Sequence, residues 1–217
     1  MTNPTTATDR IRDAAMRLFA EHGARDISIS DLAQAAGVAR GTIYNNLPRP
    51  EALFDDVVAD LACEMFARVS ASMAGLDDPA RRVATGLRMF LARAHAEPHW
   101  GRFILRFAAS DDTLRRMMDD APAQDIAAGI AAGRFAIDPD QTGAAVGLLT
   151  GACLVSIQAV LSGYQTWRDA GSNSAELALR AFGLSPAEAR AIAREDLPAL
   201  APPSAMRAMA EPRETRS

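Results

Sequence analysis

Residues 28–46 read SISDLAQAAGVARGTIYNN, which has the pattern of two short helices joined by a turn. Ser28 stands three residues before Asp31, a spacing that resembles a capping box and predicts a helix start. Gly37 supplies the turn, and a second short helix is expected over residues 39–46. This arrangement is typical of a helix-turn-helix motif, whose second helix enters the major groove of DNA.

The rest of the chain also carries the signals of helices. Alanine and leucine are abundant, and the alternation typical of strands is scarce. We therefore predict an all-α fold with a short N-terminal unit over residues 1–50 and a larger helical body over 51–197. The tail, residues 198–217, contains four prolines and is expected to be poorly ordered.

Prolines and polar caps predict where the helices of the body begin and end. Pro98 is expected to restart the chain after a break. A helix capped at Ser110 is expected to be interrupted by Pro122. A late helix is expected to begin near Asn173 and to end near Gly183.

Composition and charge exclude several classes of protein. Apolar residues make up 49% of the 217 residues and charged residues 23%, which is ordinary for a globular protein and argues against a disordered chain. All 23 basic residues are arginine, and 27 acids give a net charge of −4, which excludes a uniformly basic coat protein. Residues 1–50 carry six arginines and five acids, so any DNA binding there rests on a few placed contacts.

The second helix of the motif has a face suited to DNA. Ile43 and Leu47 are four residues apart and are expected to pack inward. The side chains left for solvent or DNA belong to Arg40, Thr42, Tyr44, Asn45 and Asn46. Arginine can bind guanine, asparagine can bind adenine, and hydroxyl groups suit phosphates. A polar, solvated helix is the alternative that composition leaves open.

Several segments of the first part of the chain resemble one family. They read AAMRLF (14–19), SISDLAQAAGV (28–38), GTIY (41–44) and EALF (51–54), with Gly23 between the first two. Their order and spacing resemble the TetR/AcrR family of bacterial transcriptional repressors, and GIAAGRF (129–135) looks like the segment before that family's dimer-forming helix. The resemblance implies an all-helical homodimer with an N-terminal DNA-binding domain and a C-terminal domain for ligand binding and dimerisation.

The resemblance also implies DNA contacts at individual positions. Family positions that touch, or often touch, DNA phosphate are occupied here by Ser28, Thr42 and Tyr44. Family positions that face base edges or the adjoining backbone are occupied by Arg40, Gly41 and Asn45. The expected partner is a palindromic operator in double-stranded DNA, bound by a repressor that a small-molecule effector releases.

Two positions depart from the family pattern. Pro50 stands where the family usually has a phosphate-binding lysine, and Arg49 is the candidate to replace that contact. Ala39 stands where the family often has serine, so the side-chain cap of this helix is lost. These departures support an alternative function, a helical dimeric module that binds a ligand or protein and has weakened or lost DNA binding.

The dimer is expected to form through a row of small residues. Gly143, Gly147 and Gly151 repeat every four residues, which lets another helix backbone approach closely. The family pairs this helix with a later one, on which Leu177 and Phe182 are the candidate interface residues. Tight packing inside one subunit is the alternative for the glycine row.

The effector pocket is expected among the middle helices. The candidates are apolar, aromatic and sulfur-containing residues, which form adaptable linings and favour an apolar or aromatic effector. They are Met89, Phe90, Trp100, Phe103, Phe107, Met117, Met118, Cys153 and Ile157. For each of them, a place in the ordinary core is the alternative.

No enzyme, cofactor or metal site is expected. The sequence has no G-x-S-x-G elbow, P-loop, G-x-G-x-x-G after a strand or H-E-x-x-H motif. His95 and His99 have the spacing of helical metal ligands, but Pro98 lies between them and is expected to break the helix.

The expected location is the cytoplasm, with no role in a membrane. The N-terminus has no signal-peptide pattern. The stretch 141–167 has no charged residue and is interpreted as a helix buried on most sides, with a membrane span as the alternative. Cys63 and Cys153 are expected to be buried thiols, although one disulfide is left open.

Overall fold

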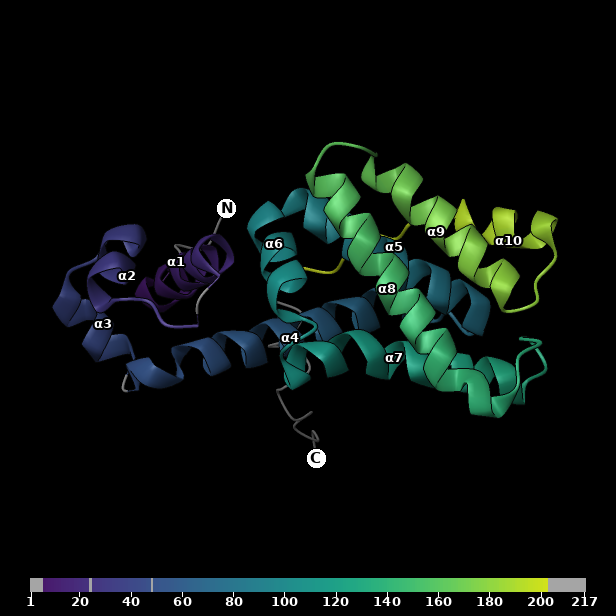
Figure 1. Ribbon diagram of the computed structural model, residues 1–217, viewed down its shortest axis with the longest axis horizontal. Helices are drawn as coiled ribbons and strands as arrows, with labels where there is room; N and C mark the ends of the chain where they lie inside the picture. Colours follow the sequence, from purple (N-terminus) through teal and green to yellow (C-terminus); the bar gives the residue numbers. More distant parts are fainter. Residues whose placement is uncertain (1–5, 24, 48, 203–217) are drawn as a thin grey trace, which may run out of the picture.

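The computed structural model of the chain describes residues 6–23, 25–47 and 49–202 (Figure 1). All regular elements in these residues are helical, which confirms the predicted all-α fold. In chain order they are α1 (Ala7–His22), α2 (Ile29–Ala36), α3 (Arg40–Asn46), η1 (Pro50–Ala52), α4 (Leu53–Ser72), α5 (Pro79–Ala96), α6 (Pro98–Phe107), α7 (Asp112–Ala131), η2 (Pro139–Gln141), α8 (Thr142–Leu161), α9 (Trp167–Ala181) and α10 (Pro186–Ala193).

Helices α1 to α3 form a small unit, called the head below, whose helix ends are set by local capping. The backbone N–H of Asp9 donates to Thr6 Oγ1 at 3.1 Å, and the N–H of Thr6 donates back to Asp9 Oδ2 at 2.9 Å. At α2 the N–H of Asp31 donates to Ser28 Oγ at 3.1 Å. Gly37 ends α2 in the left-handed region with φ 63°, where glycine carries no steric penalty.

Helix α4 connects the head with the body, the name used here for α5 to α10 (Figure 1). Near its start, the Phe54 ring packs edge-on against Phe19 of α1, with centroids 5.1 Å apart. The same ring packs against Phe107 of α6 at 4.9 Å. Farther along α4, Met65 is buried in the body. One helix therefore contributes to the packing of both units.

Helix α5 is the centre of the body. It packs against α6, α7, α8, α9 and α10, while α8 and α9 also pack against each other. Arg93 of α5 is buried, and it is paired with Glu64 of α4 at 2.9 Å and with Glu97 at 3.1 Å. These pairs compensate a charge that would be costly to bury alone.

The structure corrects the expected interruption at Pro122. Helix α7 runs without a break from Asp112 to Ala131, with Pro122 inside it, and its N-cap is Asp111 rather than Ser110. Proline removes one hydrogen-bond donor from a helix, but α7 packs against α4, α5 and α8 and this tertiary packing holds the helix together.

The structure also corrects the expected start of the late helix. Helix α9 begins at Trp167, not near Asn173, because Thr166 caps it. The backbone N–H of Asp169 donates to Thr166 Oγ1 at 3.1 Å, the same local arrangement that starts α1 and α2.

After α10 the chain returns to α4. The Nε of Arg68 donates to the carbonyl of Ala201 at 2.6 Å, and the N–H of Ala201 donates to Ser72 Oγ at 2.8 Å. These bonds involve the beginning of the tail that was expected to be poorly ordered (198–217); the rest of that tail, 203–217, lies outside the described residues.

Candidate functional site

Helix α3 presents a polar outer face at the end of the head. Ile43 and Leu47 are buried as predicted. Tyr44 is 60% exposed, and Arg40, Gly41 and Asn45 are exposed beside it, while Thr42 is half-buried. Helix α3 contains no acidic residue, so nothing on the helix itself repels a polyanion. As expected from Ala39, no side chain caps its first turn.

Asn46 differs from the other predicted DNA contacts. Its Oδ1 accepts a hydrogen bond from Thr8 Oγ1 of α1 at 2.9 Å, and its Nδ2 donates to the Thr42 carbonyl at 2.7 Å. Asn46 is half-buried and holds the end of α3 against α1. A structural role fits this geometry better than the DNA contact expected from its polar side chain.

Ser28 and Arg49 lie at the starts of α2 and η1, the elements before and after α3 in the chain. The Ser28 hydroxyl, besides capping α2, donates to Asp31 Oδ2 at 2.7 Å. Arg49 lies at the start of η1, and its exposed guanidinium is 4.0 Å from Asp56 Oδ1. Such a long, exposed pair contributes little and leaves the arginine able to reach a phosphate.

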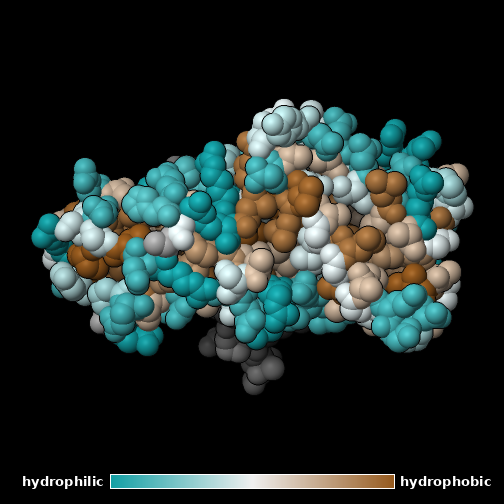
Figure 2. Space-filling model, viewed as in Figure 1, coloured by the Kyte–Doolittle hydropathy of each residue, from teal (hydrophilic) through white to brown (hydrophobic). Residues whose placement is uncertain are grey.

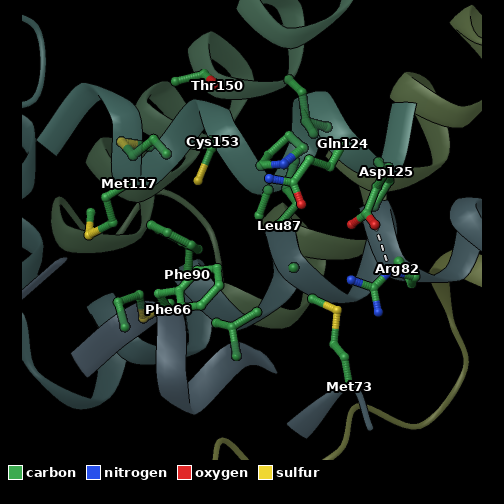
Figure 3. Close-up of a pocket in the computed structure, with 18 of the residues that line it drawn as sticks. Phe66, Met73, Arg82, Leu87, Phe90, Met117, Gln124, Asp125, Thr150 and Cys153 are labelled. Carbon is green, nitrogen blue, oxygen red and sulfur yellow. Dashed lines mark hydrogen bonds and ion pairs between the residues drawn. The ribbon is translucent and has the colours of Figure 1, made fainter. Parts of the chain in front are cut away.

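The body contains a pocket of about 140 Å³ between α4, α5, α7 and α8 (Figure 3). Most of its lining is apolar, with aromatic rings and sulfur atoms. It consists of Met65, Phe66, Val69, Ser70, Met73, Arg82, Val83, Gly86, Leu87, Phe90, Met117, Met118, Ala121, Pro122, Gln124, Asp125, Leu149, Thr150 and Cys153. A few polar side chains stand among them on all four helices, as expected of a binding pocket with a few orienting groups, and its two charged residues are on α5 and α7.

One ion pair sits at the edge of this pocket. The Nε of Arg82 on α5 donates to Asp125 Oδ1 on α7 at 2.6 Å (Figure 3). Asp125 is only 9% exposed, and burial raises the pKa of its carboxyl above the usual value, while Arg82 acts in the opposite direction. Burial also raises the pKa of the Cys153 thiol to about 12, so this sulfur is a neutral part of the lining.

Four of the nine residues predicted for the pocket line it: Phe90, Met117, Met118 and Cys153. The other five are buried core residues outside its lining: Met89, Trp100, Phe103, Phe107 and Ile157. Phe103 and Phe107 pack on Phe54 where head and body meet, at 5.8 and 4.9 Å. Trp100 touches the pocket indirectly, through the Phe90 ring at 5.7 Å.

The sequence interpretation missed the wall that α4 contributes. Met65, Val69 and Met73 line the pocket from this helix. They continue the four-residue spacing of the apolar stripe that begins at Leu53, so the signal was present in the sequence. Periodicity alone does not show which buried residues border a cavity, so the stripe did not point to a pocket wall.

Helices α8 and α9 leave an apolar face uncovered in the single chain. Figure 2 shows apolar surface along the band where α8 runs in Figure 1. Leu148, Val155 and Leu177 are exposed large apolar residues of this region. Gly143, Gly147 and Gly151 are exposed, and a Cβ atom at any of them would meet nothing within 4 Å. The alternative of tight packing inside one subunit is therefore wrong.

Phe182 does not belong to this exposed face. It is 1% exposed, and its ring packs against Phe135 with centroids 5.3 Å apart. Phe182 is therefore part of the body's own core, which corrects its place among the interface candidates. Leu177, 62% exposed, stays available to a partner.

The long uncharged helix is less buried than expected. The segment Pro139–Leu161 is long and apolar enough to cross a membrane, and 28% of its most apolar window is buried. The expectation of burial on most sides is thus wrong for the single chain, because one side packs on the body and another faces outward. By itself this length and composition are weak evidence for a membrane span.

The histidines and cysteines form no metal or redox centre in the described part of the chain. No group of three or more metal-binding side chains is found there. His95 and His99 lie on α5 and α6, on either side of the break that Pro98 predicted. Cys153 is buried as expected, Cys63 is exposed contrary to expectation, and both are free.

Two family models cover most of the chain. Residues 11–57 match the model of bacterial regulatory proteins of the tetR family, and this range includes most of α1 and all of α2 and α3. Residues 78–195 match the model of the tetracycline repressor-like C-terminal domain, which includes α5 to α10.

The chain is also similar to individual proteins that are named as HTH-type transcriptional regulators. An uncharacterized HTH-type transcriptional regulator of Mycobacterium tuberculosis is 34% identical over 87 residues, which are 38% of this chain and 43% of that protein. The repressor KstR2 of Rhodococcus jostii is 33% identical over 69 residues, 31% of this chain and 34% of its own. The matches thus span less than half the length of these curated relatives.

A solved structure extends the similarity over nearly the whole chain. RolR in complex with resorcinol is 29% identical, with a TM-score of 0.66, over 90% of this chain and 96% of that chain. With a helix-turn-helix head and a matched helical body, this chain belongs to the TetR family of DNA-binding transcriptional regulators.

Proposed function

We propose that the protein is a repressor that binds a palindromic operator as a homodimer and releases it when a small apolar or aromatic effector enters the body. The observation that carries this proposal is the course of α4. Its first turn packs on the head through Phe54, and its later turns form a wall of the pocket through Met65 and Met73. A ligand that shifts α4 therefore also shifts the head.

The proposal divides the chain into a DNA-binding unit over residues 1–50 and an effector-binding and dimerisation unit over 51–197. In the first unit, Arg40, Gly41 and Asn45 are the proposed base contacts, and their exposure on α3 supports this assignment. Tyr44, Thr42, Ser28 and Arg49 take phosphate contacts. Base contacts set the sequence preference, whereas phosphate contacts set the position on the duplex.

The homodimer rests on the uncovered face of α8 and α9. Three glycines on one face of α8 let a second backbone approach closely, and Leu148, Val155 and Leu177 supply apolar area around them. A two-fold interface would cover this face on both subunits at once. It would also place two heads to meet successive major grooves roughly 34–36 Å apart.

Release of DNA follows from a difference in affinity between two conformations. An effector shifts the population only if it binds better to a body whose heads are wrongly spaced. A coupling of about 1–3 kcal/mol changes operator affinity five- to 150-fold. The pocket's aromatic and methionine lining, and the resorcinol complex of the similar protein RolR, support an aromatic effector. A regulator of this kind works in the cytoplasm, where the operator is.

The test begins with selection of binding sites from random duplexes by the purified protein. The selected sites are expected to be inverted repeats with half-sites one helical turn apart. Fluorescence anisotropy of a selected duplex then measures affinity with and without a panel of small aromatics. Selection of a non-palindromic site would contradict the dimeric mode of binding. Unchanged affinity with every member of a panel that binds the protein would contradict effector release.

A further inference from the structure

We infer that the pocket of the body is built for an uncharged molecule with a single ring and at least one hydroxyl group, held by Asp125 and Gln124. This inference rests on the proposed function in one respect, because it names the chemistry of that same effector site. Three observations support it: the volume of the cavity, the pairing of its two charged side chains, and one carboxylate oxygen of Asp125 to which no described residue donates.

The volume limits the size of the ligand. The cavity measures about 140 Å³. An apolar protein cavity of about 150 Å³ is known to accommodate benzene. The space between the walls therefore suits one substituted ring.

The charges of the lining cancel. Arg82 donates its Nε to Asp125 at 2.6 Å and its Nη1 to the carbonyl of Leu76 at 3.4 Å. An anionic ligand would meet the Asp125 carboxylate, and a cationic ligand would compete with Arg82. Because an uncompensated charge is expensive to bury, an ion of either sign would add a net charge to a lining whose own charges are paired.

The second carboxylate oxygen of Asp125, Oδ2, is able to accept a hydrogen bond from a ligand. Oδ1 of Asp125 accepts from Arg82, but among the described residues no group donates to its Oδ2. The side chain is 12% exposed and lines the cavity. A ligand hydroxyl would supply the missing donor, in a hydrogen bond strengthened by the charge of the acceptor.

Gln124 adds a second, adjustable contact. Its amide lies beside the centre of the pocket in Figure 3 and offers both donors and an acceptor. On α8, the Thr150 hydroxyl already donates to Asp119 Oδ1 at 2.9 Å, and the Cys153 thiol is a weak donor. The Ser70 hydroxyl of α4 also lines the cavity. Gln124 and Asp125 are adjacent on α7, and we assign recognition of the ligand hydroxyl to this pair.

Four probes of similar size test this inference by calorimetric titration of the full chain without DNA. They are resorcinol, 1,3-dimethylbenzene, benzoate and protonated benzylamine. Resorcinol is expected to bind at least tenfold more tightly than each of the others, because a site built to hydrogen-bond a hydroxyl rejects an analogue that leaves its polar groups unpaired. Equal or tighter binding of any of the other three would overturn the inference, and so would the absence of binding by all four.

Two variants and a matched control assign the contacts. Asp125→Asn leaves Arg82 without its counter-charge, so the preference is expected to move at least tenfold toward benzoate. Gln124→Leu, at a more exposed position, is expected to weaken resorcinol several-fold with less effect on 1,3-dimethylbenzene. Asp120→Asn makes the same change on the same helix at an exposed position outside the lining, and it should leave the preference unchanged. If Asp120→Asn and Asp125→Asn shift the preference equally, the assignment to Asp125 is wrong.

DNA release is measured separately, by anisotropy of a selected operator with each probe. Tight resorcinol binding without release would contradict the proposed function and leave the chemistry of the pocket standing. Release by benzoate, with resorcinol bound weakly, would contradict the inference and leave the repressor mechanism standing.

Discussion

Arg25 of the head and Asp111 of the body lie 3.5 Å apart, from Nη2 to Oδ2. Asp111 is the N-cap of α7, the helix that carries Gln124 and Asp125 of the pocket, and its Oδ1 accepts from the N–H of Thr113 and of Leu114. Arg25 also donates to the Ser110 carbonyl at 3.1 Å. The pocket thus has a second connection to the head, besides α4.

Arg25→Ala is expected to uncouple the effector from DNA. A shift at the start of α7 would then no longer pull on the head through this pair, so release of the operator by ligand should fall at least several-fold. Affinity for the operator without ligand should change little, because Arg25 is not among the residues proposed to contact DNA. The measurement is operator affinity by anisotropy at zero and saturating ligand. Arg17→Ala is the control, since this arginine donates to the Ala35 carbonyl within the head; an equal loss of coupling in both variants would rule out the Arg25 connection.

Arg40 and Tyr44 are expected to act differently on DNA. Arg40→Ala should cost about 1–3 kcal/mol and relax the base preference at one position of each half-site, because an arginine fork reads guanine. Tyr44→Phe should weaken binding about equally on all sequences, because a hydroxyl on phosphate carries no base information. Binding-site selection with each variant measures this. An unchanged selected motif with Arg40→Ala would remove its base-reading role.

Gly147→Leu is expected to weaken the dimer without harming the subunit. Nothing in the described chain lies within 4 Å of an added Cβ there, so the helix itself accepts a side chain. Across a close two-fold contact, the same side chain would force two backbones apart. Sedimentation velocity over a dilution series should show a dissociation constant raised at least tenfold, with an unchanged circular dichroism spectrum. Ala59→Leu, at an exposed position of α4, is the control, and a dimer unperturbed by Gly147→Leu would place the interface elsewhere.

Asp78→Asn is expected to lower stability in a pH-dependent way. Asp78 accepts from Arg134 Nε at 3.0 Å and Nη2 at 3.1 Å, and these bonds lower the pKa of its carboxyl below the usual 3.8. A lowered pKa contributes stability above pH 3.8 that is lost as the pH falls through the folded value. Asparagine still caps α5, so the loss at pH 7 should be about 1–2 kcal/mol, from the charged hydrogen bonds alone.

Urea unfolding at pH 7 and at pH 3 checks this expectation. The difference between the wild-type chain and Asp78→Asn should shrink at pH 3, where the unfolded carboxyl is mostly protonated. Asp112→Asn is the control, because its pair with Arg115 is fully exposed and should leave stability unchanged. A difference of the same size at both pH values would show that the Asp78 charge is not what Arg134 stabilises.

Local chemistry predicted much of the head and failed where tertiary packing decides. Ser28 and Gly37 set the two ends of α2 through contacts within a few residues, and Ala39 leaves the start of α3 without a side-chain cap. These local features could therefore be predicted from the sequence. Pro122 is a local breaker that packing on three neighbouring helices overrides. The start of α9 was placed six residues late, because the Thr166 cap, equally local, was overlooked.

In the candidate sites, too, tertiary packing decides features that the local sequence does not show. Phe90 and Phe103 lie on apolar helix faces and look alike in sequence, yet one borders the pocket and the other fills the junction with the head. Asn46 looks like a DNA contact until the position of Thr8, far away in the chain, is known. Whether a buried side chain borders a cavity depends on how whole helices are placed relative to one another. The spacing of apolar residues along the sequence does not contain this information.

Helix α4 both packs on the head and lines the pocket. This limits how the protein can acquire new ligand specificities. A substitution at Met65 or Val69 that reshapes the cavity also alters the helix on which the head is mounted, so it tends to change repression along with ligand choice. Gln124 stands at an exposed position of α7 and is freer to vary. Descendants that respond to other molecules should therefore differ first on the α7 wall, while the α4 wall is retained.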